Sequence, residues 1–141
     1  MSARDLAILS ESVLRDFPEY FHYYDEREFT YNGIRQSNRN PLLYNYPGAD
    51  GFKTGHTEEA GYGLTATAER DGRRLILVIN GLESKKARAM ESAKLLDWGF
   101  REFDNYALFK AGDTVEVAPV WLGVSPTAEM KITRDVFITM S

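Results

Sequence analysis

The chain has 141 residues, enough for one domain with its own core, or for one domain and part of another. Its composition, 43% hydrophobic and 27% charged, is ordinary for a globular protein, and a net charge of -4 without any Lys/Arg run argues against nucleic acid as a partner. The lack of cysteine excludes disulfides and thiol catalysis, and two distant histidines, His22 and His56, give no reason to expect a metal site.

The first expected element is a helix that begins almost at residue 1. Ser2 and Asp5 have the spacing of a capping box, and Pro18 ends the run. Apolar residues recur between them at helical intervals: Leu6, Leu9, Val13 and Phe17. We interpret this stripe as core packing. The start lacks the charged head and apolar block of a signal peptide, and no apolar run is long enough to span a membrane.

Residues 19–47 predict a long irregular segment rich in Tyr, Asn and Arg. A short strand is expected at residues 28–31, followed by a turn at Asn32-Gly33. Its aromatic residues, next to Arg35 and Arg39, could form a stacking surface for single-stranded nucleic acid or sugar. Given the acidic total charge, we favour packing of a loop over the core.

Residues 50–57 predict a short strand that could form one wall of an active site. Gly55 would leave the strand bare, so that an extended substrate could pair with its backbone. Lys53 would bring a positive charge to that edge, and Thr54 and Thr57 offer hydroxyls for a carboxylate. Backbone N–H groups just after Gly55, at His56, could face a developing oxyanion. The alternative is an ordinary strand with a solvated lysine.

A three-stranded antiparallel meander is expected around this strand. Residues 62–69 alternate between apolar and polar side chains, which predicts a half-buried strand. Asp71-Gly72 is a hairpin signal, and the apolar run 75–79 suits a central strand. Because the strand near residue 50 comes first, it can lie at the sheet edge.

A second helix is predicted from Ser84, which would cap it. Its apolar stripe is Ala89, Ala93, Leu96, Phe100 and Phe103, which would pack on the sheet. Arg88 falls in the first turn, where the helix dipole disfavours a cation, so a partner elsewhere is plausible. A solvated arginine is the alternative.

From Leu108 the pattern changes to short strands separated by turn signals at Gly112-Asp113 and Ser125-Pro126. Strands are expected around residues 115–117, 120–124, 130–132 and 136–140. This indicates an all-β unit that is too small to bury a core, and is therefore truncated or supported by the first unit.

Several segments together resemble the low-molecular-mass penicillin-binding proteins, which are serine-type D-alanyl-D-alanine carboxypeptidases of the bacterial envelope. Lys53-Thr54-Gly55 matches the K-T-G motif of that family. The other matching segments, in collinear order, are residues 2–7, 29–34, 38–40, 50–57, 60–64, 95–100, 119–123 and 135–139. The resemblance implies an α/β (α+β) fold, an antiparallel sheet packed by helices. Residues 1–106 would be the C-terminal part of the catalytic domain and residues 107–141 the start of a β-rich domain.

The resemblance also implies roles for individual residues. Lys53 would lie near the nucleophile, Thr54 and Arg88 would hold the terminal carboxylate of a peptidoglycan stem peptide ending in D-Ala-D-Ala, and the His56 N–H would form half of the oxyanion hole. Gly55 completes the motif and Thr57 adds a substrate contact. β-Lactam antibiotics would bind the same strand edge, and no metal or organic cofactor is needed.

The nucleophile implied by the family is missing. No serine of the chain is followed three residues later by lysine, and neither Ser-x-Asn nor Tyr-x-Asn occurs. We therefore expect a fragment that lacks the first half of the catalytic domain and is inactive alone. Its location would be the periplasm or another extracytoplasmic compartment, with any membrane attachment through other parts of the parent protein. The alternatives are a β-lactamase or an endopeptidase on this fold, or a non-catalytic module that binds cell-wall peptides.

Overall fold

A computed structural model describes residues 1–141, which form two compact units, Met1–Phe100 and Arg101–Ser141. The helices are α1 (Ala3–Asp16), the 3₁₀ helix η1 (Pro18–Tyr24), α2 (Leu42–Asn45) and α3 (Lys85–Glu102). The strands of the first unit are β1 (Glu28–Tyr31), β2 (Ile34–Ser37), β3 (Ala49–Thr57), β4 (Gly61–Arg70) and β5 (Arg73–Leu82). None of the helices is long and apolar enough to cross a membrane. The domain division expected at residues 106 and 107 stays a prediction.

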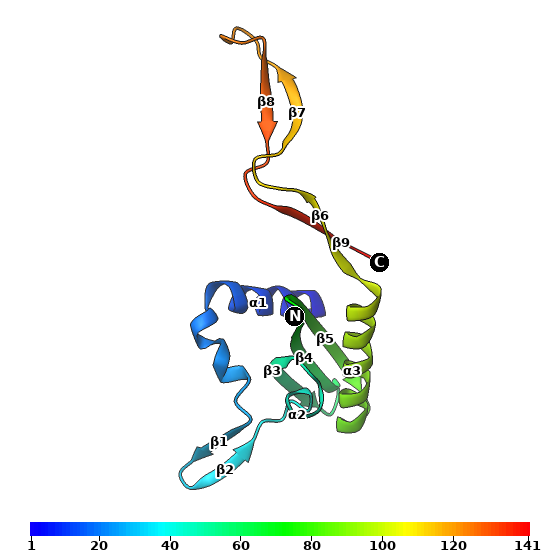
Figure 1. Cartoon of the computed structure of the whole chain (residues 1–141). Coiled ribbons are helices and arrows are strands. Elements are labelled where there is room, and N and C mark those ends of the chain that lie inside the picture. The colour runs from blue at the N-terminus through cyan, green and yellow to red at the C-terminus, as the bar shows by residue number, and fades with distance from the viewer. The chain divides into compact units, whose positions relative to one another are not determined.

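The first unit is built on an antiparallel sheet in the order β3-β4-β5 (Figure 1). The predicted meander and the edge position of β3 are confirmed. Asp71 and Gly72 have φ angles of 50° and 75°, which a tight hairpin turn requires. The central position expected for residues 75–79 is wrong, because β4 lies in the middle and β5 at the second edge.

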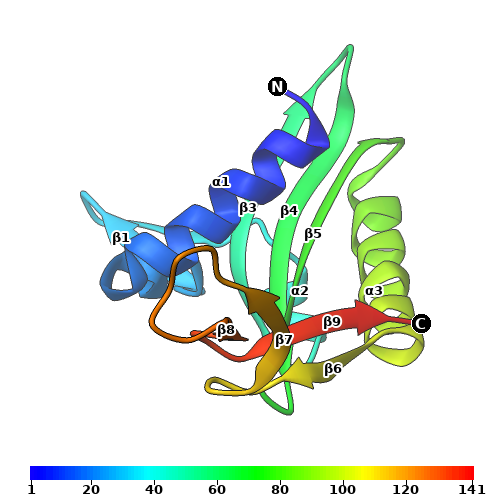
Figure 2. The same ribbon diagram turned by 90° about the horizontal axis from the view of Figure 1, so that it is seen from above.

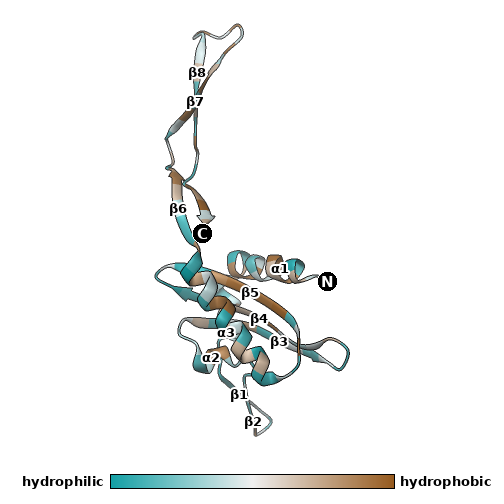
Figure 3. Ribbon diagram, turned by 90° about the vertical axis from the view of Figure 1, so that its right-hand side faces the viewer, coloured by the Kyte–Doolittle hydropathy of each residue, from teal (hydrophilic) through white to brown (hydrophobic).

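Both faces of this sheet are covered, which explains the apolar run in β5. Figure 3 shows α1 on one side of the sheet and α2 and α3 on the other, and Figure 2 shows α1 crossing the strands. The apolar run of β5 therefore indicates that helices cover both faces of this strand. It does not indicate a central position in the sheet. For the same reason β4 is buried on both faces from Gly63 to Ala68, and not half-buried as its alternating pattern predicts.

The helix α1 has the predicted cap but not the whole predicted stripe. The Ser2 hydroxyl accepts from the Asp5 N–H at 3.2 Å, and the Asp5 carboxylate accepts from the Ser2 N–H at 2.7 Å. Leu6 and Val13 are half-buried, whereas Leu9 and Phe17 are 54% and 52% exposed. The buried residue of the helix is Ser10, whose hydroxyl donates to the Leu6 carbonyl at 2.8 Å.

The main core lies between the sheet and the α2/α3 layer. Its buried side chains are Leu42, Tyr46, Leu64, Ala66, Ala68 and Leu96, with Ala93 and Phe100 packed against them. Ala66 and Ala68 of β4 share this cluster with Leu96 of α3. The cap at Ser84 is confirmed by a 3.0 Å bond from the Ala87 N–H, but the helix ends at Glu102, one residue before Phe103.

Residues 17–48 hold more regular structure than predicted. The strand at residues 28–31 and the turn at Asn32-Gly33 are confirmed, and β2 completes an exposed hairpin with β1. The short helices η1 and α2 were not anticipated, because no period-3.6 pattern marks them.

The second unit is a two-stranded ribbon in which no residue is buried. Its strands are β6 (Asp104–Phe109), paired with β9 (Val136–Met140), and β7 (Thr114–Pro119), paired with β8 (Thr127–Lys131). The strand expected at residues 120–124 is wrong, because these residues form the turn between β7 and β8, with Leu122 at φ 56°. β6 was not predicted as a strand.

We expect Leu96→Ala to destabilise the first unit by about 2–5 kcal/mol, because Leu96 is 2% exposed in the core. Leu95→Ala is the matched control, since its neighbour on α3 is 40% exposed and should cost much less. Urea unfolding followed by far-UV circular dichroism compares the two. Equal losses of unfolding free energy would contradict this description of the core.

Candidate functional site

A cleft of about 660 Å³ lies along the free edge of β3 and beside the start of α3. Its lining residues are Arg39, Lys53, Thr54, Gly55, His56, Tyr62, Lys85 and Arg88. Five of the six residues predicted for the site therefore line one cleft. The sixth, Thr57, is the last residue of β3, where its hydroxyl accepts from the Ala60 N–H at 3.0 Å, and it does not line the cleft.

The orientation of the β3 backbone follows from the contact of Lys53. The Lys53 Nζ donates to the Thr54 carbonyl at 3.0 Å, which indicates that this carbonyl faces the free edge. In an antiparallel strand the N–H and C=O of one residue point to the same side, and every second residue shares that side. By this alternation the backbone of His56 faces the free edge as well, where an extended ligand could pair with it.

The middle of the β3 edge is bare. A Cβ at Gly55 would meet nothing within 4 Å, so the surface in front of this residue is open. Gly63 lies opposite Gly55 in β4, where a Cβ would collide with the side chain of Asn80. One strand position further, His56 packs on Tyr62 with ring centroids 4.0 Å apart. The open surface is thus confined to Gly55, because the side chain of Asn80 fills the space in front of Gly63.

Arg88 is a buried cation without a carboxylate partner. It is 6% exposed, its Nη2 donates to the Arg39 carbonyl at 3.1 Å, and its guanidinium carbon lies 5.8 Å from the centre of the Tyr62 ring. Its Nε is buried without a hydrogen-bond partner. Burial lowers the pKa of Arg88 from its ordinary value. Because burial of a cation without a counter-ion is unfavourable, this geometry suits a ligand that carries an anion.

Three lining residues were missed as site residues: Arg39, Tyr62 and Lys85. Arg39 was considered only as part of an aromatic loop, although it lies inside the Asn38-Arg39-Asn40 segment of the resemblance. Tyr62 was assigned to a strand face. The signal for Lys85 was its position next to the Ser84 cap, which puts it in the same helical turn as Arg88.

The two neighbours of Arg39, Asn38 and Asn40, hold the backbone of this segment in place through side-chain hydrogen bonds. Asn40 is fully buried, and its side chain donates to the Gly51 carbonyl of β3 at 2.8 Å and accepts from the Leu42 N–H at 3.1 Å. The Asn38 side chain accepts from the Asn40 N–H at 2.9 Å and donates to the Glu26 carbonyl at 2.9 Å. The carbonyl that receives Arg88 is therefore tied to the strand that carries Lys53 and Thr54.

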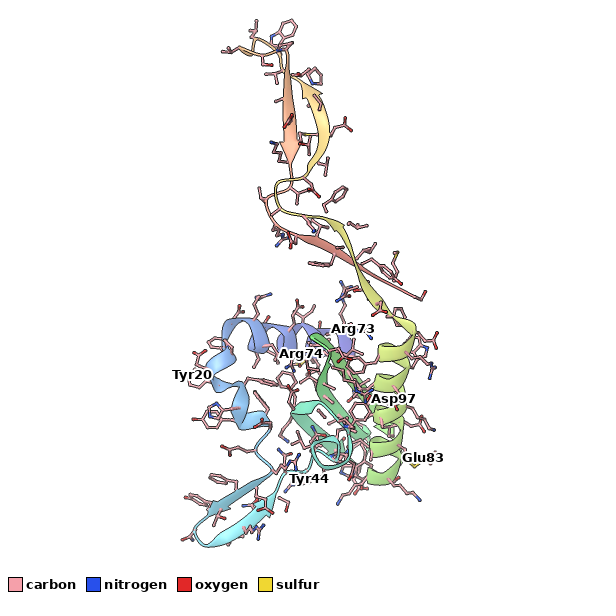
Figure 4. The ribbon with its side chains drawn as sticks, viewed as in Figure 1. Tyr20, Tyr44, Arg73, Arg74, Glu83 and Asp97 are labelled. Atoms are coloured by element: carbon pink, nitrogen blue, oxygen red, sulfur yellow. The ribbon has the colours of Figure 1, made fainter.

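The start of β3 is tied to the other strands by Arg74, which is labelled in Figure 4. Its guanidinium pairs with Asp50 of β3 at 2.7 Å and with Glu69 of β4 at 2.6 Å, and it donates to the Thr67 hydroxyl at 3.0 Å. Burial raises the pKa of Asp50, while the Arg74 guanidinium opposes this rise. The contacts join all three strands just before the lysine of the site.

The lining of the cleft limits its chemistry. It contains no serine, cysteine, aspartate or glutamate, so it offers neither a serine or cysteine nucleophile nor a carboxylate base. The chain has no group of three or more His, Cys, Asp or Glu side chains that could hold a metal ion. What the cleft offers is an open strand edge, the hydroxyl groups of Thr54 and Tyr62 and four cationic side chains, which suit the binding of an extended anionic ligand.

Comparison with known proteins gives D-alanyl-D-alanine carboxypeptidases as relatives of this chain. The model of the D-alanyl-D-alanine carboxypeptidase family matches residues 1–84. The D-alanyl-D-alanine carboxypeptidase DacA of Escherichia coli is 46% identical over 140 residues, and DacF of Bacillus subtilis is 33% identical over 141. These alignments cover 99% and 97% of this chain but 35% and 36% of the relatives. The chain thus spans about a third of the length of the curated relatives it matches.

Solved structures agree with this result. Penicillin-binding protein 5 from Haemophilus influenzae has a TM-score of 0.88 at 42% identity, covering 99% of this chain and 41% of that one. Penicillin-binding protein D2 from Listeria monocytogenes, in its cefotaxime-bound form, has a TM-score of 0.64 at 35% identity, covering 69% and 40% of the two chains. The mixed α/β fold class expected from the sequence is confirmed.

We expect Asn40→Ala to destabilise the first unit by about 1–3 kcal/mol, because the Gly51 carbonyl and the Leu42 N–H would lose their buried partner. Asn45→Ala, at the exposed end of α2, is the matched control and should change the unfolding free energy by less than about 1 kcal/mol. Urea unfolding measures both variants. A loss at Asn40 no larger than that at Asn45 would show that the amide does not tie Arg39 to the strand.

Proposed function

The chain belongs to the D-alanyl-D-alanine carboxypeptidase family, and on this premise we propose that it supplies the carboxylate-recognition side of a serine-type carboxypeptidase active site. The complete enzyme would remove the terminal D-alanine from peptidoglycan stem peptides. A serine attacks the carbonyl between the two D-alanines, the last D-alanine leaves, and water hydrolyses the acyl-serine. Such an enzyme acts outside the cytoplasm, where its polymer lies, and β-lactams would acylate the same serine.

The observation that carries the proposal is that the Lys53–His56 edge and the buried guanidinium of Arg88 line one cleft. Thr54 and Arg88 would hold the terminal carboxylate, since a hydroxyl and a guanidinium together fix the position of an anion. The outward N–H of His56 would stabilise the oxyanion. Lys53 would lie beside the nucleophile and stabilise charge there. Thr57 would act on substrate only through the turn that it caps.

The serine itself would come from outside these 141 residues. The cleft is lined by none, and no serine of the chain has a lysine three residues later. Recognition of the substrate, by the residues of this cleft, is thus separate from formation of the acyl-serine bond, which needs the absent serine. The recognition side alone can bind and polarise a peptide but cannot form an acyl-enzyme.

Two other functions fit parts of the same geometry. A β-lactamase or an endopeptidase would use the same strand edge, and would be recognised by turnover of penicillin or of cross-linked peptides. A non-catalytic module would bind D-Ala-D-Ala peptides reversibly through the β3 edge and Arg88, which requires no serine. We favour the carboxypeptidase, because the relatives over almost the whole chain carry that name.

We expect a fluorescent penicillin to leave the 141-residue chain unlabelled, because no activated serine faces the cleft. The positive control is a hybrid in which this chain replaces the matched part of the Escherichia coli relative, which supplies the remaining sequence. The hybrid should be labelled and should release D-alanine from a D-Ala-D-Ala peptide. Gel fluorescence after denaturation distinguishes covalent from reversible binding.

Either of two results would contradict the proposal. Covalent labelling of the isolated chain would place a nucleophile within it. A folded hybrid without carboxypeptidase activity would show that the cleft does not serve this reaction, and reversible binding of the peptide by the isolated chain would then favour the module.

In the hybrid, Arg88→Lys should lower kcat/KM for D-Ala-D-Ala peptides by about tenfold to a hundredfold, because lysine cannot make the same paired bonds to a carboxylate. The matched control is Arg101→Lys in the last turn of α3, where the side chain is exposed and pairs with Glu102. Steady-state release of D-alanine measures both. An Arg88→Lys hybrid as active as the control would remove Arg88 from carboxylate recognition.

A further inference from the structure

The core uses only part of the aromatic segment at residues 19–47. Phe21 and Tyr24 pack on Phe52 of β3, with ring centroids 5.2 and 4.8 Å apart, as expected for a loop that covers the core. Other rings of the segment are between 55% and 60% exposed, namely Tyr20, Tyr23 and Phe29. Exposed rings that lie together are typical of ligand-binding grooves, and the proposed reaction uses none of these three.

Two of the exposed rings line a groove of about 300 Å³ where η1 meets the hairpin of β1 and β2. Figure 1 shows this hairpin projecting from the sheet of the first unit. Phe29 and Gln36 are directly opposite in the pairing of the two strands, so both side chains lie on one face of the hairpin. We call this the hairpin groove, and its lining residues are Tyr23, Glu26, Phe29, Gln36, Ser37 and Asn38.

A second groove, of about 360 Å³, connects the hairpin groove to the cleft. It shares Tyr23, Gln36 and Asn38 with the hairpin groove. It shares Arg39, Lys53 and Thr54 with the cleft. A ligand in the hairpin groove is therefore held beside the residues that the proposed reaction uses.

The walls of the hairpin groove are held in place by contacts within the chain. The Tyr23 ring packs on His22, with centroids 4.0 Å apart, and is stacked on Tyr20 at 6.5 Å. The Asn38 side chain donates to the Glu26 carbonyl at 2.9 Å and so joins the two sides of the hairpin base. Because these side chains are already ordered, a ligand that stacks on them loses little affinity to ordering.

The polar groups of the hairpin groove indicate which kind of ligand fits. The Gln36 amide and the Glu26 carboxylate are exposed and pair with no other side chain. No lysine or arginine lines this groove, whereas four line the cleft. Nucleic acid needs cations for its phosphates, and Glu26 would repel an anionic peptide. A neutral ligand rich in hydroxyl and amide groups fits, because carboxylate and amide oxygens accept from both.

We infer that the hairpin groove binds N-acetylhexosamine units of a glycan chain. The C–H groups on one face of such a sugar pack on the negative face of an aromatic ring, which Tyr23 and Phe29 supply. Its hydroxyl and acetamido groups then reach Glu26 and Gln36. The inference rests on the proposed function for the choice of polymer, since peptidoglycan carries these sugars beside its stem peptides. A glycan held in the groove presents its peptides to the cleft at a raised local concentration.

The first test measures sugar binding by the 141-residue chain, which requires no reaction. The probe is the soluble tetramer of N-acetylglucosamine, and binding is followed by NMR titration. Tyr23→Ala and Phe29→Ala should each weaken binding by about threefold to tenfold, because each variant removes one stacking ring. Tyr31→Ala is the matched control, since this ring of β1 is 70% exposed and lines neither groove, and it should leave the affinity as it is.

The second test measures turnover by the hybrid with two substrates. One is a free pentapeptide that ends in D-Ala-D-Ala, and the other is a soluble, uncross-linked glycan chain that carries the same peptide. The glycan-linked peptide should be preferred, and Phe29→Ala should lower the ratio of the two kcat/KM values by about threefold to tenfold through KM. Tyr31→Ala should leave this ratio unchanged.

The outcomes separate the inference from the proposed function. The inference is overturned if the sugar does not bind the chain, if Tyr31→Ala loses as much affinity as Tyr23→Ala, or if Phe29→Ala leaves the turnover ratio unchanged. Equally tight binding of a single-stranded oligothymidylate would overturn it in favour of unselective stacking. None of these results affects hydrolysis of the free pentapeptide. A folded hybrid that fails to hydrolyse that peptide contradicts the carboxypeptidase function, while sugar binding by the chain would still support the groove.

Discussion

The buried guanidinium of Arg88 is the constraint on which the cleft depends. A cation that is 6% exposed and has no carboxylate partner is costly, and the fold compensates it with one backbone carbonyl and one aromatic face. Both partners come from elements that the sheet holds in place. The Arg39 carbonyl is anchored to β3 through Asn40, and Tyr62 belongs to β4. Arg88 therefore keeps a fixed position relative to the edge that carries Lys53 and Thr54.

The topology brings together residues that are far apart in the chain. The meander puts β3 at one edge, and its third strand ends at the same end of the sheet where the turn between β3 and β4 lies. A helix that starts there points its first turn toward the end of β3. Lys53 and Arg88, 35 positions apart in sequence, thus line one cleft with no long loop between them. Gly55 keeps the strand edge beside Thr54 open, since a Cβ there would meet nothing within 4 Å.

Sequence reasoning succeeded where the deciding signal is local. The hairpin at Asp71-Gly72, the capping box at Ser2 and the motif at Lys53 are each contained in a few adjacent residues, and the structure has the turn and the cap as predicted. Sequence reasoning failed where the burial of a residue depends on which other elements pack over it. The apolar run of β5 reports helices on both faces, and Leu9 is exposed although it has the spacing of a core residue. Arg39 and Lys85 were missed for the same reason, since only the tertiary arrangement turns a loop and a helix start toward β3.

The distribution of apolar and charged groups indicates what kind of binding the cleft supports. The exposed apolar side chains of the first unit lie elsewhere, as at Ile8 of α1 and Phe29 of β1, while the cleft has Tyr62 and His56 as its only rings. Burial of apolar surface can therefore contribute little there, and affinity must come from charge and from backbone hydrogen bonds. Such contacts are directional and give specificity more than strength. A site of this kind distinguishes peptide ends by where their carboxylates lie, which is the discrimination that a carboxypeptidase requires.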